Sequence, residues 1–250
     1  MITRFPEESF VHPPFGLEGL APCTAADDTW AYWRPAVAGI VELGTVRGTD
    51  VGLPGHFHDE DQITFVIAGQ RRFLLGDAQV TIAAGRGLCI PAGMAHRSLP
   101  ESGGVLCMNL YLRAGEYDTH RLLDRLAKAW PIQGAAWDAL VEQARRRHRD
   151  PYPPLAAGRP LMSRSATSVR AAASEFAMSR EGYSRAFRRR YGLPPQAFDI
   201  VRRLNHARGL LRAGTPPADA AALAGFADQS HLGRCFRRIF GVTPARYRAG

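Results

Sequence analysis

The sequence predicts an α+β protein of two domains, a β-barrel followed by an all-α domain. Short apolar segments separated by Gly- and Pro-containing turns fill residues 30–112, a pattern typical of a barrel or sandwich. Beyond residue 167, apolar residues recur at helical spacing. Residues 151–250 contain 17 Arg and 5 acidic residues, a net charge of +12, and the whole chain carries +9, so residues 1–150 carry −3. A basic module joined to a slightly acidic one predicts a polyanionic partner for the C-terminal part.

Composition excludes several other classes of protein. A hydrophobic content of 46% is enough for a buried core, and the sequence contains no run of 18 apolar residues that could span a membrane. The start, MITRFPEESFVHPP, lacks the apolar segment of a signal peptide. We therefore expect a cytoplasmic protein with no membrane partner. Cys23, Cys89, Cys107 and Cys235 lack CxxC spacing and are expected to be reduced core residues.

The N-terminal part divides into an arm and a barrel. Residues 1–29 contain several prolines and aromatic residues and show no period, so an irregular arm is expected. The barrel is expected over residues 30–115. Its predicted strands are 36–43, 63–68, 70–75, 79–82, 87–90 and 105–112.

A helical segment, residues 116–148, is expected to follow the barrel. Apolar residues at i, i+4 and i+8 predict one helix over 117–130, and a second is predicted over 134–147. Their apolar faces can cap the open side of the barrel or form a dimer interface, and the sequence does not decide between these roles. Residues 149–167 contain four prolines and are expected to be a linker.

An internal repeat defines the C-terminal domain, residues 168–250. The segments SREGYSRAFRRRYGLPPQAF and DQSHLGRCFRRIFGVTPARY match in register at an offset of 49 residues. Each predicts a helix-turn-helix whose second helix begins after a capping residue, Ser179 or Asp228. In the second unit, Leu232, Phe236 and Phe240 form the buried stripe. A long helix over 196–212 is expected to join the units, with Ile200, Leu204, Ala207 and Leu211 buried.

These motifs resemble the DNA-binding domain of AraC/XylS-type transcription regulators. The resemblance implies two recognition helices that enter adjacent major-groove segments of double-stranded DNA. Carried over residue by residue, the base-contacting positions are Glu181, Ser184 and Arg185 in the first unit and Gln229, Ser230, Gly233 and Arg234 in the second. The positions for phosphate contacts are Arg180, Arg188, Arg189, Arg237 and Arg238.

The first unit departs from the family pattern in two ways. Ala177 stands where the family usually has Gly, and the helix that normally precedes the unit would fall on the Pro-rich residues 151–166. We therefore expect the second unit to be the better-formed reader of DNA.

The stretch 52–96 resembles a cupin barrel, as AraC-type sensor domains do. His56, His58 and Gln62 follow the first cupin motif and His96 the second, although metal-binding cupins usually have Glu at the position of Gln62. The three histidines could hold Zn²⁺ or Fe²⁺, or they could line an effector pocket without metal. The metal-free pocket is preferred, and no cofactor is expected. The expected pocket residues are Trp30, Tyr32, Trp33, His56, His58, Phe73, Met94 and His96, with the N-terminal arm as a lid.

The resemblance implies a sequence-specific transcription regulator controlled by a small-molecule effector. An activator is expected, although the sequence does not decide between an activator and a repressor. It is expected to be a homodimer that can also contact RNA polymerase, and not an enzyme. One alternative is a cupin metalloenzyme with a three-histidine site and a DNA-binding tail. Another is a constitutive DNA-binding or architectural protein whose barrel serves only for dimerisation.

Overall fold

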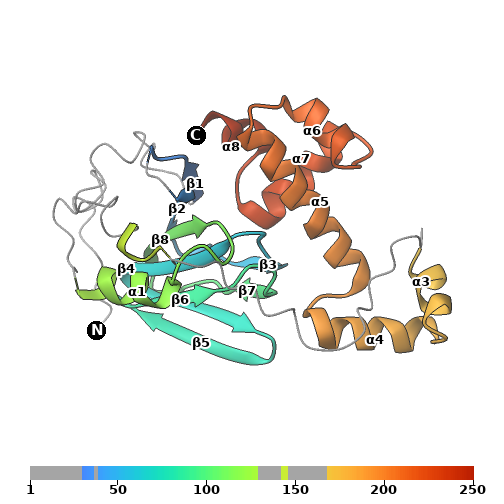
Figure 1. Ribbon diagram of the computed structural model, residues 1–250, viewed down its shortest axis with the longest axis horizontal. Coiled ribbons are helices and arrows are strands. Elements are labelled where there is room, and N and C mark those ends of the chain that lie inside the picture. Colours follow the sequence, from blue (N-terminus) through green and yellow to red (C-terminus); the bar gives the residue numbers. More distant parts are fainter. Residues whose placement is uncertain (1–29, 37–38, 129–141, 146–167) are drawn as a thin grey trace.

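The computed structural model describes residues 30–36, 39–128, 142–145 and 168–250 (Figure 1). An antiparallel sheet that curls on itself forms the N-terminal domain, and helices form the C-terminal one, which confirms the predicted fold class. The strands are β1 (Trp30–Trp33), β2 (Ile40–Gly48), β3 (Leu53–His56), β4 (Asp61–Leu75), β5 (Ala78–Ala83), β6 (Gly87–Ile90), β7 (His96–Ser98) and β8 (Val105–Leu112).

Strand β4 holds the barrel together because it pairs with four others. Its first half, residues 61–69, pairs with β8 and β6, and its second half, residues 70–75, pairs with β5 and β7. A register shift between Val66 and Ala68 lies near the end of the first half. Such irregularities bend a strand, so β4 passes from one side of the barrel to the other. The full order is β1-β2-β8-β4-β7-β3, with β5 and β6 beside β4.

Several strand predictions need correction. The segments 63–68 and 70–75 are one strand, because Gly69-Gln70 continues the pairing instead of turning. The strand predicted at 36–43 is Ile40–Gly48. Three short strands were not predicted: β1, β3 and β7 have three or four residues each, too few to show an alternating pattern. The strands predicted at 87–90 and 105–112 are confirmed.

One helix that follows the barrel packs on the sheet. Helix α1 (Thr119–Lys128) lies against β6 and β4, and its Leu122 and Leu126 are fully buried. It therefore covers one face of the barrel. Most of the helix predicted over 134–147 lies outside the described residues, as do the arm and the linker.

The C-terminal domain follows the predicted repeat. The first unit comprises α3 (Val169–Glu175) and α4 (Arg180–Tyr191), and the second comprises α6 (Pro217–Leu223) and α7 (Gln229–Phe240). Helix α5 (Pro195–Arg212) joins them, and α8 (Pro244–Ala249) ends the chain. The predicted caps are confirmed, since the Ser179 side chain accepts from Gly182 N and that of Asp228 from His231 N. No helix in the described part of the chain is long and apolar enough to cross a membrane.

A shared core joins the second unit to the barrel. One cluster of buried residues runs from Trp30 and Tyr32 in β1 to Leu204 in α5 and Phe236 in α7. The first unit has a separate small core around Tyr183 and Phe187. On α5, Ile200 is only half-buried, contrary to prediction, whereas Val201 is buried. This shift arises because the barrel covers a second face of α5, where Asn205 and Arg208 are also buried.

Candidate functional site

A cavity lies in the barrel beneath helix α7. Three histidines, His56, His58 and His96, form part of its wall, and Ile239 of α7 closes it from the C-terminal domain. The cavity is narrow and has room for about one water molecule. Its lining residues are Trp30, Tyr32, Leu53, His56, His58, Gln62, Arg71, Phe73, His96, Ser98, Asn109, Tyr111 and Ile239.

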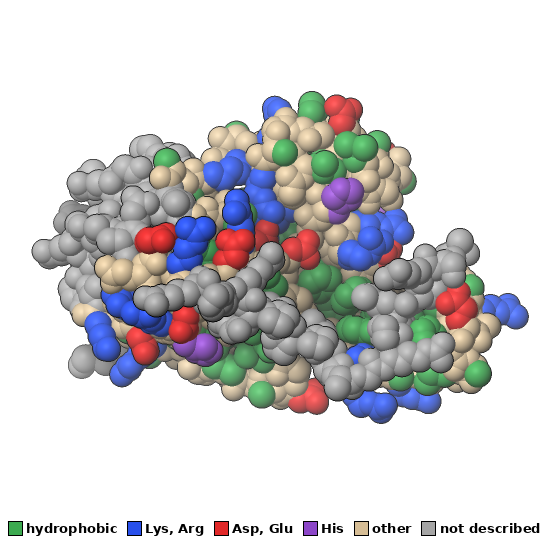
Figure 2. Space-filling view, in the orientation of Figure 1, with side chains coloured by type: hydrophobic (Ala, Val, Ile, Leu, Met, Phe, Trp, Pro, Cys, Tyr) green, Lys and Arg blue, Asp and Glu red, His purple; other side chains and the backbone are tan. Residues whose placement is uncertain are grey.

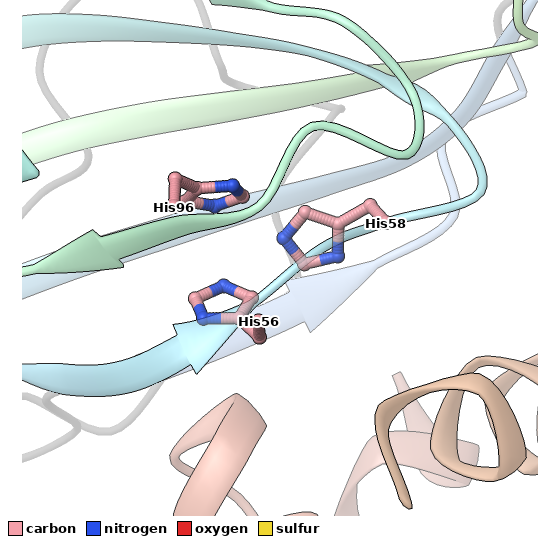
Figure 3. Close-up of side chains that lie close together, drawn as sticks. All are labelled: His56, His58 and His96. Atoms are coloured by element: carbon pink, nitrogen blue, oxygen red, sulfur yellow. The ribbon is translucent and has the colours of Figure 1, made fainter. Parts of the chain in front are cut away.

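Two of the histidines lie opposite each other at one end of the β3–β7 pair, and the third comes from the loop after β3. His56 and His96 are register partners, and their ring centroids are 4.3 Å apart (Figure 3). His58 lies beyond the end of β3, with its centroid 4.9 Å from that of His56 and 5.3 Å from that of His96. One nitrogen of each ring lies within 4.8 Å of those of the other two, so the structure brings the three side chains together.

Burial keeps these imidazoles neutral. Desolvation lowers the pKa of His96 to about 4, and it lowers the pKa values of His56 and His58 well below their ordinary value. His56 Nδ1 donates to Pro54 O at 2.8 Å, and His96 Nδ1 donates to Met94 O at 3.0 Å. Both rings therefore carry the proton on Nδ1 and offer the lone pair of Nε2.

His58 has the opposite proton arrangement. Arg208 of α5 lies with Nη1 3.0 Å from His58 Nδ1, and a guanidinium can only donate, so His58 Nδ1 accepts. The proton of neutral His58 is then on Nε2, which leaves that nitrogen without a lone pair for a metal ion. The charges of Arg71 and Arg208 also act on His56. The three histidines have suitable spacing for a metal ion, but their surroundings do not fit one while α5 is docked.

Arg208 is also the centre of a buried ion network between the domains. Its guanidinium lies 3.1 Å from Glu42 Oε2 and 3.2 Å from Glu60 Oε2. Arg212, one turn further along α5, contacts the same two carboxylates. Tyr247 of α8 accepts from Arg208 Nε at 3.1 Å and donates to Glu42. Two cations thus face two anions, which compensates the cost of burying them.

The network shifts the pKa values of Arg208 and Glu60 in the expected directions. Burial alone would lower the pKa of Arg208, but Glu42, Tyr247 and Glu60 raise it well above its ordinary value. Burial alone would raise the pKa of Glu60, but Arg208 and Arg212 lower it. Folding therefore favours the charged form of each group.

The two repeats dock on the barrel through equivalent corners. Gly192 follows α4 and lies against Ala95, while Gly241 follows α7 and lies against Trp30. The last aromatic residues of the two repeat segments also correspond: Phe198 packs on Phe57 of the barrel with 4.7 Å between ring centroids, and Tyr247 bonds Glu42. The C-terminal ends of both recognition helices therefore face the barrel.

The predicted DNA-contacting side chains lie away from this interface. Most are exposed, and Ser184 and Gly233 are half-buried. Figure 2 shows arginine side chains along the lower edge of α4. The exposed members of the predicted sets are Arg180, Glu181, Arg185, Arg188 and Arg189 on α4 and Gln229, Ser230, Arg234, Arg237 and Arg238 on α7.

The structure corrects the predicted list of pocket residues. Six of the eight line the cavity, but Trp33 belongs to the core on the α1 side of the barrel and Met94 is 41% exposed. Sequence reasoning missed Arg71, because an arginine in an apolar strand suggests a surface position. It also missed Arg208 and Ile239, because nothing in the sequence of a DNA-binding domain indicates contact with a second domain.

Comparisons with known proteins agree with this architecture. Residues 39–177 match the model of the AraC-like ligand binding domain, and residues 172–250 match a helix-turn-helix domain. The probable transcriptional regulator LumQ of Photobacterium leiognathi is 24% identical over 236 residues, which are 81% of this chain and 94% of LumQ. The regulator ExsA of Pseudomonas aeruginosa is 38% identical over 77 residues, 30% of this chain and 28% of ExsA.

Solved structures resemble each domain separately. The DNA-binding domain of AdpA, solved in complex with a target DNA, is 32% identical, with 34% of this chain and 77% of that chain covered and a TM-score of 0.32. A cupin protein from Bacteroides fragilis is 17% identical, with 42% and 92% covered and a TM-score of 0.34. Because the ligand-binding model alone matches more than half of the chain, the protein belongs to the AraC family: it is an AraC-type transcription regulator with a ligand-binding domain and a helix-turn-helix DNA-binding domain.

Proposed function

We propose that a small-molecule effector in the barrel cavity controls DNA binding by changing how the C-terminal domain docks. The observation that carries this proposal is that Ile239, on recognition helix α7, closes the same cavity that the barrel histidines line. A molecule larger than water needs more room than the docked cavity has, and displacement of Ile239 would provide it. The contents of the cavity and the position of α7 are thereby thermodynamically linked.

Helix α5 supports the same linkage from a second direction. Arg208 contacts cavity residue His58, and Asn205 Nδ2 donates to Phe57 O at 2.9 Å. Since α5 also carries both helix-turn-helix units, a change at its barrel-facing side can alter the placement of α4 and α7 together. The predicted lid, residues 1–29, lies outside the described residues and is not needed for this linkage.

The roles of the exposed side chains in DNA binding follow from their chemistry. We propose that Arg185 and Arg234 read guanine, Gln229 adenine and Glu181 cytosine, with contacts from Ser184 and Ser230 and close approach at Gly233. The remaining arginines contact phosphates: Arg180, Arg188, Arg189, Arg237 and Arg238. The exposure of these groups supports the assignment.

The proposal extends to assembly and location. We propose a cytoplasmic homodimer that pairs through part of the segment 116–148 and acts as an activator alongside RNA polymerase. Its relatives are transcription regulators, and we propose no catalytic role for the histidines. Sedimentation equilibrium tests the dimer, and a monomer at micromolar concentration would contradict it.

Gly241→Ala tests whether docking controls DNA binding. Gly241 has φ +77°, and a Cβ there would lie 2.4 Å from the Trp30 ring, so alanine should loosen the barrel contact. Gly214→Ala is the matched control, because Gly214 has φ +90° but open space around its Cβ position. Both variants carry the same kind of backbone strain, and only one disturbs docking.

The measurement is affinity for an operator selected from random DNA. We expect Gly241→Ala to change the Kd at least about fivefold relative to Gly214→Ala, the lower end of typical coupling between sites. Equal affinities would reject control through docking.

Arg234→Ala tests base reading. If Arg234 reads guanine, its loss should cost roughly 1–3 kcal/mol for the selected operator and relax specificity at one base pair. Arg238→Ala, on the same helix, should weaken binding to all sequences alike. Uniform weakening by Arg234→Ala would reassign Arg234 to phosphate contact.

A further inference from the structure

Arg71 places a buried positive charge in the wall of the cavity. Its side chain, on β4, is 1% exposed, and its terminal nitrogens donate to two carbonyls, Leu99 O at 3.1 Å and Val51 O at 2.8 Å. The rings of Trp30 and Phe73 lie near the guanidinium, with centroids 5.7 and 5.2 Å from Cζ. The Nε–H donor has no acceptor among the described residues, and each terminal nitrogen keeps a second hydrogen.

No carboxylate neutralises this charge from within the cavity. The described lining residues include neither Asp nor Glu. Glu101 lies outside the cavity, and its negative charge acts on Arg71 from there. Its carboxylate accepts hydrogen bonds from Arg72, from the backbone N at 2.6 Å and from Nε at 3.0 Å. Burial raises the pKa of Cys107 to about 11, so this neighbour of Arg71 is a neutral thiol. An arginine stays protonated even when buried, so the wall remains positive.

Two unpartnered acceptors share this cavity. His96 Nε2 and Gln62 Oε1 are buried without hydrogen-bond donors among the described atoms. The amide nitrogen of Gln62 is already used, since it donates to Thr64 Oγ1 at 2.9 Å and to Asn109 Oδ1 at 3.2 Å. A buried polar atom without a partner costs free energy, which a ligand of complementary chemistry recovers.

We infer that the cavity binds a small organic hydroxycarboxylate, its carboxylate on Arg71 and its hydroxyl donated to His96 Nε2 or Gln62 Oε1. This inference rests on the proposed effector control and names the chemical class of the effector. A guanidinium is well suited to a carboxylate. The same positive wall disfavours a divalent cation at the three histidines, where Arg208 already occupies the Nδ1 lone pair of His58.

Binding of such a molecule requires α7 to move. A hydroxycarboxylate has several non-hydrogen atoms, whereas the docked cavity admits about one water molecule. Ile239 is the only lining residue from the C-terminal domain among those described, so it is the side chain that a displaced α7 withdraws. The ligand thus binds the undocked state and shifts the population toward it.

Matched acids and amides test the ligand class on the full-length protein. Calorimetric titrations use glycolate against glycolamide and lactate against lactamide, with propionate as the acid that lacks the hydroxyl. We expect each hydroxy acid to bind at least about tenfold more tightly than its amide, and lactate more tightly than propionate. Equal binding of acid and amide, or no binding by either acid, would overturn the inference.

Three variants locate the site. Arg71→Gln should abolish the preference for acid over amide, Arg71→Lys should keep part of it, and Arg97→Gln, an exposed arginine on β7, should leave it unchanged. Ile239→Ala should raise lactate affinity, because it makes room without undocking. If Arg71→Gln melts below the assay temperature, Arg71→Lys and Ile239→Ala still decide the outcome.

Separate readouts distinguish this inference from effector control itself. Small-angle scattering should show a larger radius of gyration with saturating lactate, as with Gly241→Ala, and unchanged scattering despite binding would overturn the displacement of α7. If Gly241→Ala alters operator affinity but no acid binds, the ligand class is wrong and docking control stands. Stoichiometric Zn²⁺ binding that is lost in His58→Gln and unaffected by acids would replace the anion site with a metal site.

Discussion

Arg208 of α5 donates to Nδ1 of His58 in the barrel across 3.0 Å, and both side chains are almost fully buried. This contact connects the helix that carries both DNA-reading units with a side chain of the cavity wall. It also fixes which nitrogen of His58 bears the proton. Movement of either side chain therefore alters the hydrogen bonding of the other.

Arg208→Gln should weaken the interface strongly. The substitution removes one of two cations that face Glu42 and Glu60, and breaking a buried ion pair typically costs about 3–5 kcal/mol. Arg202→Gln is the control, because Arg202 pairs with Asp199 on the exposed side of the same helix and such pairs contribute at most about 1 kcal/mol. Urea unfolding followed by fluorescence measures both. A loss from Arg208→Gln no greater than that from Arg202→Gln would show that the network is not stabilising.

Ala177→Gly should stabilise the first helix-turn-helix unit. Ala177 has φ +53°, a left-handed conformation that costs a non-glycine residue roughly 1–2 kcal/mol. Glycine removes this strain, but it also raises the conformational entropy of the unfolded chain, which offsets part of the effect. We therefore expect the free energy of unfolding to rise by about 0.5–1 kcal/mol. Ala213→Gly is the opposite control: φ there is −76°, and glycine should destabilise by a similar amount. Thermal melting compares them, and a lower Tm for Ala177→Gly would mean that strain at this turn is negligible.

The helical domain was predictable because its signals are local. Ser179 and Asp228 cap the helices that the sequence assigned to them, and Leu232, Phe236 and Phe240 are buried as the four-residue spacing predicts. Even the departure at Ala177 was visible, although the sequence could not show that alanine keeps the left-handed turn.

The interface between the domains was not predictable from spacing alone. Arg208 and Asn205 are polar, and helical periodicity assigns polar residues to the solvent side, yet both are buried against the barrel. Their partners Glu42 and Phe57 lie 166 and 148 residues away in the sequence. Arg71 was missed for a similar reason: two carbonyls and two aromatic rings make its burial tolerable, and all of these except Phe73 lie 20 or more residues away in the sequence.

Acidification should destabilise the barrel through the buried histidines. Burial lowers the pKa of folded His96 to about 4, against about 6.5 in the unfolded chain. Between pH 6.5 and pH 4, His96 is therefore protonated in the unfolded chain but neutral in the folded protein. The contribution of neutral His96 to the free energy of unfolding is complete above pH 6.5 and is lost as the pH falls toward 4. At pH 5 the loss from His96 alone is about 2 kcal/mol.

Free energies of unfolding in urea at pH 7.5 and pH 5 measure this loss. His96→Gln should reduce the difference between the two pH values by about that amount, and His206→Gln, at an exposed histidine on α5, is measured beside it as the matched substitution. An identical pH dependence in wild type and His96→Gln would show that His96 titrates normally in the folded protein.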